Sequence, residues 1–239
     1  MARKIFLVFL LLAVFTQRHP WLAQTHDPGF YQDTIRGEVW IELEPIYGFR
    51  LDSEYPLTWQ TASMRALQET AWYFSGMIYG WSFHYDIGER ARGIAEDFSV
   101  FEPMGEIPWA DPRLRVTDVE HHDTYLRIWA DYHLSEIQQR RVHQWRTGTV
   151  RNAQAMGYCP MQGPTPESGW LDIRNAVLKD AARAAVRGML QASERNRPKE
   201  ATGYISLASF PRFYVDSGRW AAFVRFRIQI NEIIPFAVH

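Results

Sequence analysis

The spacing of apolar residues changes along this chain, and that change constrains the fold more than any other feature. Residues 58–79 carry apolar side chains three and four positions apart, which is typical of an amphipathic helix. In residues 38–44 the apolar residues alternate instead, with Val39, Ile41 and Leu43 on one face, which indicates a half-buried β-strand. We therefore expect helices and strands that share one core.

A helix followed by two alternating strands occurs twice in the sequence. The first helix is residues 58–79, and the second, rich in alanine, is residues 171–192. The strands that follow them are expected at residues 114–119, 124–134, 204–215 and 219–230. We expect a three-residue turn at 216–218 to close the second hairpin. The pattern predicts an α+β fold with antiparallel sheets and helices packed on one face. Two helix-plus-β-hairpin units are one organisation that fits it.

The N-terminus is typical of an exported protein. Arg3 and Lys4 precede an unbroken apolar run over residues 5–15. This run is too short to cross a bilayer core of about 30 Å, which needs about 20 helical residues. A basic start followed by a short apolar stretch predicts a secretory signal peptide over residues 1–24, whose cleavage point the sequence leaves open. We predict a periplasmic or extracellular protein that has no transmembrane span once the signal is removed.

Composition divides the rest of the chain. Residues 25–137 contain the first predicted helix and hairpin, and residues 169–239 contain the second. Residues 138–168 lie between them, rich in arginine at first and in glycine and proline at the end. We interpret this segment as a connector that begins as a helix and ends as a linker.

The charge balance bears on the partners. Twenty-six basic and 27 acidic residues give a formal net charge of −1. Proteins that bind nucleic acid through its phosphates need a strong basic excess, so nucleic acid is excluded as the main partner.

The densest group of metal-ligand residues is His121, His122 and Asp123, at the expected turn of the first hairpin. Imidazole and carboxylate groups bind Zn²⁺ and other divalent ions. Adjacent histidines in a hairpin point apart, however, and no His-x-x-x-His pair supports them. We interpret these residues as a solvated polar turn and keep them only as weak metal candidates.

His84 and Asp86 are the weak candidates for catalysis. A general base needs a partner within hydrogen-bond reach, and neighbouring positions in the sequence do not supply that geometry. The chain has no Gly-x-Ser-x-Gly elbow, phosphate-binding glycine loop or dinucleotide fingerprint. We therefore predict no cofactor, and a non-enzymatic protein is favoured over an enzyme.

Aromatic residues give the main indication of binding. Trp40 and Trp129 occupy the polar faces of their predicted strands, and Tyr125 and His133 share the face of Trp129. Exposed aromatic rings stack on sugar rings or contact a partner protein. The competing interpretation is that another layer covers this face and makes the rings part of the core.

The sequence thus predicts an exported cell-envelope protein that binds or scaffolds an envelope protein or glycan. A hydrolase of envelope polymers with a His/Asp site is one alternative. A protein that binds a small ligand between helix and sheet is the other.

Overall fold

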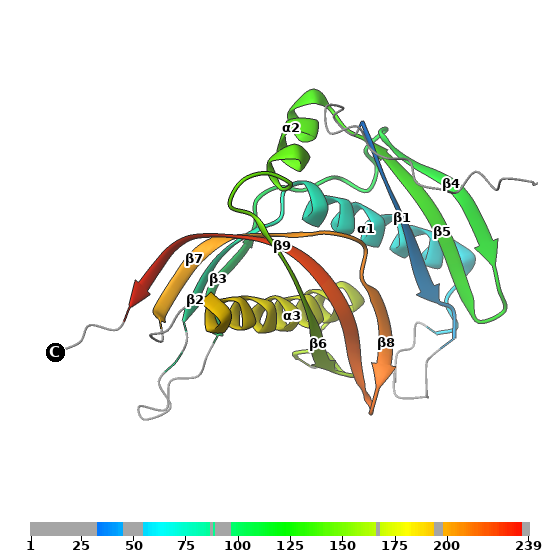
Figure 1. The fold of residues 1–239 in the computed structure, drawn as a ribbon. Helices are drawn as coiled ribbons and strands as arrows, with labels where there is room; N and C mark the ends of the chain where they lie inside the picture. The colour runs from blue at the N-terminus through cyan, green and yellow to red at the C-terminus, as the bar shows by residue number, and fades with distance from the viewer. Residues whose placement is uncertain are drawn as a thin grey trace, which may run out of the picture. The chain divides into compact units, whose positions relative to one another are not determined.

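Strand β9 organises the larger of two antiparallel sheets in the computed structural model of the protein (Figure 1). The structure describes residues 33–44, 55–86, 88, 97–165, 168–193 and 198–235. The strands of this sheet are β2 (Trp81–Asp86), β3 (Asp97–Pro103), β6 (Arg151–Pro160), β7 (Pro198–Leu207), β8 (Arg212–Asp216) and β9 (Arg219–Pro235). Their order is β3-β2-β7-β9-β6, and β8 pairs with the first part of β9. Strand β9 pairs with β8 and then with β7 along one side, and with β6 along the other.

The smaller sheet contains three strands in the order β1-β5-β4. They are β1 (Thr34–Glu42), β4 (Leu114–His121) and β5 (Tyr125–His133). Helix α1 (Trp59–Ile78) packs against the face that carries Val39, Ile41, Leu126 and Ile128, all of which are buried. Because side chains alternate along a strand, the apolar residues of β1 and β5 face the helix, and the polar residues lie with Trp40, Tyr125 and Trp129 on the other face.

Helix α3 (Trp170–Ser193) covers β6 and β9 of the larger sheet, and β9 bends over it in Figure 1. Gly157 of β6 faces the backbone of this helix. A Cβ atom at residue 157 would overlap the carbonyl oxygen of Val177 and the backbone of Ala181. Small residues on both sides therefore let helix and sheet approach closely, as the alanine-rich sequence of α3 indicates.

The α+β prediction is confirmed, and segments far apart in the sequence share the larger sheet. Strand β2 pairs with β7, so Trp81 lies opposite Ile205. The main core cluster joins apolar residues of α1, α3 and both sheets. Residues 31–239 form one compact unit. The predicted helix-plus-hairpin units at 25–137 and 169–239 therefore contribute to one common core.

Residues 138–168 were predicted to begin as a helix and to end as a linker. They begin in helix α2 (Glu136–Gln144), as predicted, but the later part contains strand β6 and not only a linker. The inward face of β6 carries Ala153, Ala155, Gly157 and Cys159, whose small side chains give a weak apolar signal. The second hairpin turn has two residues and not three, because Asp216 pairs with Arg219 and the intervening Ser217 and Gly218 both have positive φ.

The predicted signal peptide, residues 1–24, lies outside the described residues. Among the helices that the structure describes, none is long and apolar enough to cross a membrane.

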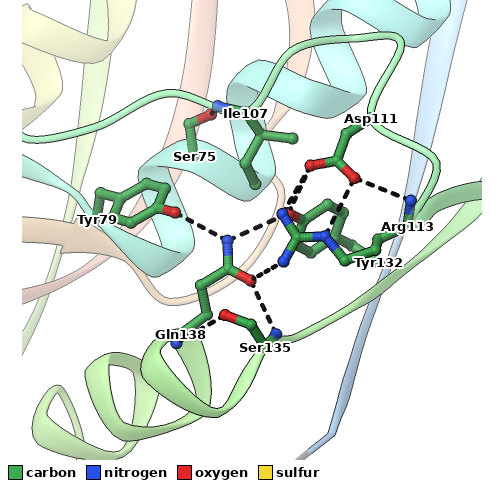
Figure 2. A network of polar contacts seen from close by, with 8 residues as sticks. All are labelled: Ser75, Tyr79, Ile107, Asp111, Arg113, Tyr132, Ser135 and Gln138. Atoms are coloured by element: carbon green, nitrogen blue, oxygen red, sulfur yellow. Dashed lines mark hydrogen bonds and ion pairs between the residues drawn. The ribbon is translucent and has the colours of Figure 1, made fainter.

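A partly buried polar network joins the C-terminal end of α1, the start of α2 and strand β5 (Figure 2). The Gln138 amide donates to the hydroxyls of Tyr79 and Tyr132, at 2.8 and 3.1 Å, and its oxygen accepts from Arg113 at 3.0 Å. Asp111 accepts from the Arg113 guanidinium at 2.8 and 3.1 Å and from the Tyr132 hydroxyl at 3.1 Å. These bonds satisfy polar groups at the end of the small sheet that packing would otherwise leave unpaired.

The Asp111 carboxylate gives this network a testable pH dependence. Hydrogen bonds from Arg113 lower the Asp111 pKa from 3.8 to about 2. Its side chain is only 10% exposed. A lowered pKa stabilises the fold above the unfolded value, and this contribution of about 2 kcal/mol is lost as the pH falls toward the folded value. We expect Asp111→Asn to lower the free energy of unfolding by about 2 kcal/mol at neutral pH.

Urea unfolding between neutral pH and about pH 3 measures this effect, because the difference from the wild type must shrink as the pH falls. Asp123→Asn, at the exposed β4–β5 turn, is the control and should change stability by less than about 0.5 kcal/mol. A deficit for Asp111→Asn that stays constant with pH would contradict the assignment.

Candidate functional site

A pocket of about 520 Å³ is lined by the edge strand β1, the start of β8 and the helices α1 and α3. Trp40 and Glu38 of β1 line it together with Tyr125, the first residue of β5. Arg212 and Phe213 of β8 contribute from the larger sheet. The pocket therefore combines residues of both sheets.

The strand pattern explains how the aromatic residues of β1 and β5 reach this pocket. Val39 and Ile41 face α1, so the residues between and beside them, Trp40 and Glu42, lie on the opposite face. Tyr125 pairs with Glu42 in the β1–β5 register. The rings of Trp40 and Tyr125 lie 4.7 Å apart between centroids. The alternation of β1 and its register with β5 thus place Trp40 and Tyr125 together as one aromatic wall of the pocket.

Two helices supply a second group of lining residues, which is polar and buried. Glu69 and Tyr73 lie one turn apart on α1, and the Tyr73 hydroxyl donates to Glu69 Oε1 at 2.5 Å. Arg174 of α3 places Nε 3.5 Å from Glu69 Oε1 and Nη2 3.6 Å from Glu42 Oε2. Glu69 is 2% exposed and Arg174 is 6% exposed. A guanidinium is therefore held between two carboxylates inside the fold.

Aromatic rings complete the surroundings of Arg174. Its guanidinium carbon lies 4.4 Å from the ring centroid of Phe213 and 4.7 Å from that of Trp220. Cation–π attraction of this kind is strongest where water is excluded. These contacts fix the guanidinium on the side of the pocket where β8 and β9 begin.

Burial shifts the protonation equilibria of these groups. It raises the pKa of Glu69, although the charge of Arg174 acts in the opposite direction. Burial and the neighbouring Glu69 raise the pKa of Tyr73 well above its ordinary value, so this phenol remains a hydrogen-bond donor. Among the described residues, Glu69 Oε2 has no hydrogen-bond partner, and Arg174 Nε has only its ion-pair contact with Glu69 Oε1 at 3.5 Å. The pocket lining thus holds an acceptor that the described part of the protein does not use.

The four residues of the predicted binding surface do not all lie in the pocket. Trp40 and Tyr125 line the pocket, but Trp129 and His133 do not. The guanidinium carbon of Arg127 lies 4.0 Å from the ring of Trp129 and 4.6 Å from that of Trp40. His133 Nδ1 is 3.1 Å from the hydroxyl of Thr34. The aromatic face is therefore partly covered by an arginine of the same sheet.

The two histidines of the β4–β5 turn point apart, as expected for neighbouring strand residues. The His121 ring packs against Trp59 at 4.5 Å between centroids, while the His122 ring stacks on Tyr125 at 4.2 Å. Within the part of the chain that the structure describes, neither they nor Asp123 belong to a group of three metal-ligand residues.

The structure does bring His84 and Asp86 together on β2, where His84 Nε2 lies 3.6 Å from Asp86 Oδ1. Both residues belong to the larger sheet and do not line the pocket.

Sequence reasoning missed the buried charges of the pocket. Glu69 follows Ala62 and Ala66 and precedes Tyr73 on the buried stripe of α1. Arg174 occupies the stripe of α3 that continues at Val177 and Ala181. A charged residue on each of two apolar stripes was the available signal, because buried charges need partners.

Comparisons with known proteins place the chain in a family. A protein-family model matches residues 26–236. The chain belongs to this uncharacterised family. An uncharacterized protein of Treponema pallidum (strain Nichols) is 27% identical over 209 residues, which cover 86% of this chain and 83% of that protein. No solved structure matches the chain.

Proposed function

We propose that the protein is an exported, non-enzymatic binding module of the cell envelope, and that its pocket holds a neutral sugar unit of an envelope glycan. The observation that carries this proposal is the combination of aromatic walls with buried carboxyl and guanidinium groups in one pocket. Sugar rings stack on aromatic side chains through their C–H faces. Their hydroxyls donate and accept hydrogen bonds, which suits both Glu69 and Arg174.

The size and charge of the pocket support a small neutral ligand. Its volume of about 520 Å³ falls within the roughly 300–1,000 Å³ that is typical of small-molecule sites. Four glutamates line the pocket (Glu38, Glu42, Glu44 and Glu69), against two arginines (Arg174 and Arg212). This acidic excess opposes the binding of anionic polymers. A neutral saccharide meets no such repulsion.

The export part of the proposal depends on the N-terminal sequence. The basic pair Arg3 and Lys4 before the apolar run at residues 5–15 supports secretion. A periplasmic or extracellular protein would meet envelope glycans directly. Expression of the full chain with a C-terminal epitope, followed by cell fractionation, tests this part separately.

The pocket itself is tested by a matched pair of tryptophan variants. We expect Trp40→Ala to weaken binding of soluble N-acetylglucosamine oligosaccharides at least about 10-fold, which corresponds to about 1.4 kcal/mol. Trp129→Ala should leave the dissociation constant within about twofold, because Trp129 contacts the same arginine but does not line the pocket. Isothermal titration calorimetry measures both, after circular dichroism has shown that each variant is folded.

Three outcomes would count against this proposal. Equal losses in the two variants would move the site to the open aromatic face of the small sheet. Unchanged binding in Trp40→Ala would remove the pocket from consideration. A wild-type protein that binds none of the neutral oligosaccharides would overturn the glycan proposal as a whole.

Hydrolysis is the second candidate function, and one observation favours it. Burial raises the pKa of Glu69, and Glu42 lies on the other side of Arg174. A carboxyl group with a raised pKa beside a second carboxylate is the arrangement that acid–base catalysis uses. Incubation with the same oligosaccharides should release no new reducing ends if the protein only binds. Release that Glu69→Gln abolishes would make it a hydrolase.

A further inference from the structure

A second group of polar residues lies on the larger sheet, away from the pocket lining. His84 and Asp86 are two positions apart on β2, so both project from the same face. Glu200 of β7 stands opposite Asp86 in the register. The alternating residues Phe83 and Tyr85 are buried in the core. The three polar side chains therefore meet on the face of the sheet that is turned away from that core.

The ligand atoms of these residues converge. His84 Nε2 lies 3.2 Å from Glu200 Oε2 and 3.6 Å from Asp86 Oδ1. One ligand atom from each residue lies within 4.8 Å of both others. Zinc bonds of about 2.0–2.1 Å at tetrahedral angles separate neighbouring ligand atoms by about 3.4 Å. The two measured distances lie on either side of that value.

We propose that His84, Asp86 and Glu200 form a binding site for a divalent transition-metal ion, with Zn²⁺ as the best match. One imidazole nitrogen and two carboxylate oxygens are a donor set that Zn²⁺ accepts readily. Three protein ligands leave the fourth tetrahedral position to water, which distinguishes this site from closed structural zinc sites. This site is independent of the glycan pocket, because none of its residues lines that pocket.

The local structure favours a formed site over a chance encounter of surface charges. The side chains of His84, Asp86 and Glu200 are 34%, 37% and 21% exposed, so each is partly enclosed and still reachable by an ion. Two paired strands hold their backbones in a fixed register. Sites built on regular elements keep ligand positions better than sites on loops. The competing explanation is an ion pair of protonated His84 with the two carboxylates, which requires no metal.

Titration of the full-length, untagged protein with Zn²⁺ separates these explanations. The proposal expects one strong site per chain by isothermal titration calorimetry. His84→Ala and Glu200→Gln should each weaken it at least about 10-fold, as expected when one ligand of such a site is lost. His133→Ala is the control, because His133 is an exposed histidine of the other sheet whose ring contacts Thr34. It should leave the affinity for zinc unchanged.

Substitution of Co²⁺ for Zn²⁺ gives a second readout. Tetrahedral Co²⁺ bound through nitrogen and oxygen absorbs visible light, and this signal should disappear in His84→Ala. Circular dichroism confirms folding of each variant, and Asp86→Asn replaces any variant that fails to fold. Absence of a stoichiometric site in the wild type would overturn the proposal. Binding that survives in both His84→Ala and Glu200→Gln, or that is lost equally in His133→Ala, would overturn it as well.

Discussion

Arg174→Met is expected to lower the free energy of unfolding by about 3–5 kcal/mol at neutral pH. It removes a buried positive charge that lies 3.5 Å from the buried Glu69 carboxylate. Methionine preserves much of the side-chain volume and its contact with Phe213 and Trp220. The loss of stability therefore comes mainly from the uncompensated charge of Glu69 and not from a cavity.

The pH dependence of this effect follows from Glu69. Burial raises its folded-state pKa, so its contribution to stability is greatest when it is protonated at low pH and is lost as the pH rises through the folded pKa. Without Arg174 the pKa of Glu69 must rise further, because the opposing positive charge is gone. The deficit of Arg174→Met should therefore be larger at about pH 8 than at about pH 5.

Chemical denaturation of three variants measures the effect and its cause. Lys179→Met is the matched control, because Lys179 lies on the same helix and pairs with Asp97 at 3.6 Å, but both side chains are exposed to solvent. It should cost no more than about 1 kcal/mol. The double variant Glu69→Gln with Arg174→Met should recover part of the loss, since no charge remains buried at residue 69. Equal losses in Arg174→Met and Lys179→Met would contradict the role of burial.

Gly157→Ala is expected to destabilise the protein by about 3 kcal/mol, although it adds a single methyl group. The new carbon would overlap the carbonyl oxygen of Val177 and the backbone of Ala181. Backbone atoms within a helix cannot move aside as a flexible side chain can. Helix α3 must therefore shift away from β6 and lose part of its contact with the sheet.

Gly188→Ala provides the control with the same chemical change on α3 itself. A Cβ atom at residue 188 meets no atom within 4 Å. Alanine is the better helix former, so this variant should be about 0.5–1 kcal/mol more stable than the wild type. Thermal and urea unfolding of both variants measure the contrast. A neutral Gly157→Ala would show that α3 does not pack on β6 as closely as the structure indicates.

Elements with a strong local period were predicted closely. The helix expected at residues 58–79 is α1, Trp59–Ile78, and the one expected at 171–192 is α3, Trp170–Ser193. The strand expected at residues 219–230 lies within β9, Arg219–Pro235. Its alternate residues from Trp220 to Ile228 are buried, and Ile230 is partly buried. Long apolar stripes identify such elements because burial acts on every turn or every second residue.

Elements whose residues give a weak apolar signal were not recognised. Strand β6 carries alanine, glycine and cysteine on its inward face, and charged or polar residues at its start. These small residues are required by the close approach of α3, as Gly157 shows. The requirement for small residues in β6 therefore comes from its packing against helix α3, which follows β6 in the chain. A pattern of neighbouring residues within β6 does not reveal this requirement.

The residues of the candidate site were also predicted only in part. The sequence placed Trp40 and Tyr125 on the polar faces of their strands, and both line the pocket. The charged residues on the two apolar stripes indicated buried partners, but not that Glu69 would meet Arg174. The sequence also did not show that His84 would lie 3.2 Å from Glu200, 116 positions away.

By itself, then, the sequence determined which residues form helices and strands and which face of each is apolar, because those properties depend on neighbours a few positions apart. Only the tertiary structure decided which charged groups share a pocket and which ligand atoms converge. Such groups come from separate elements, and the packing of the whole core sets the distances between them.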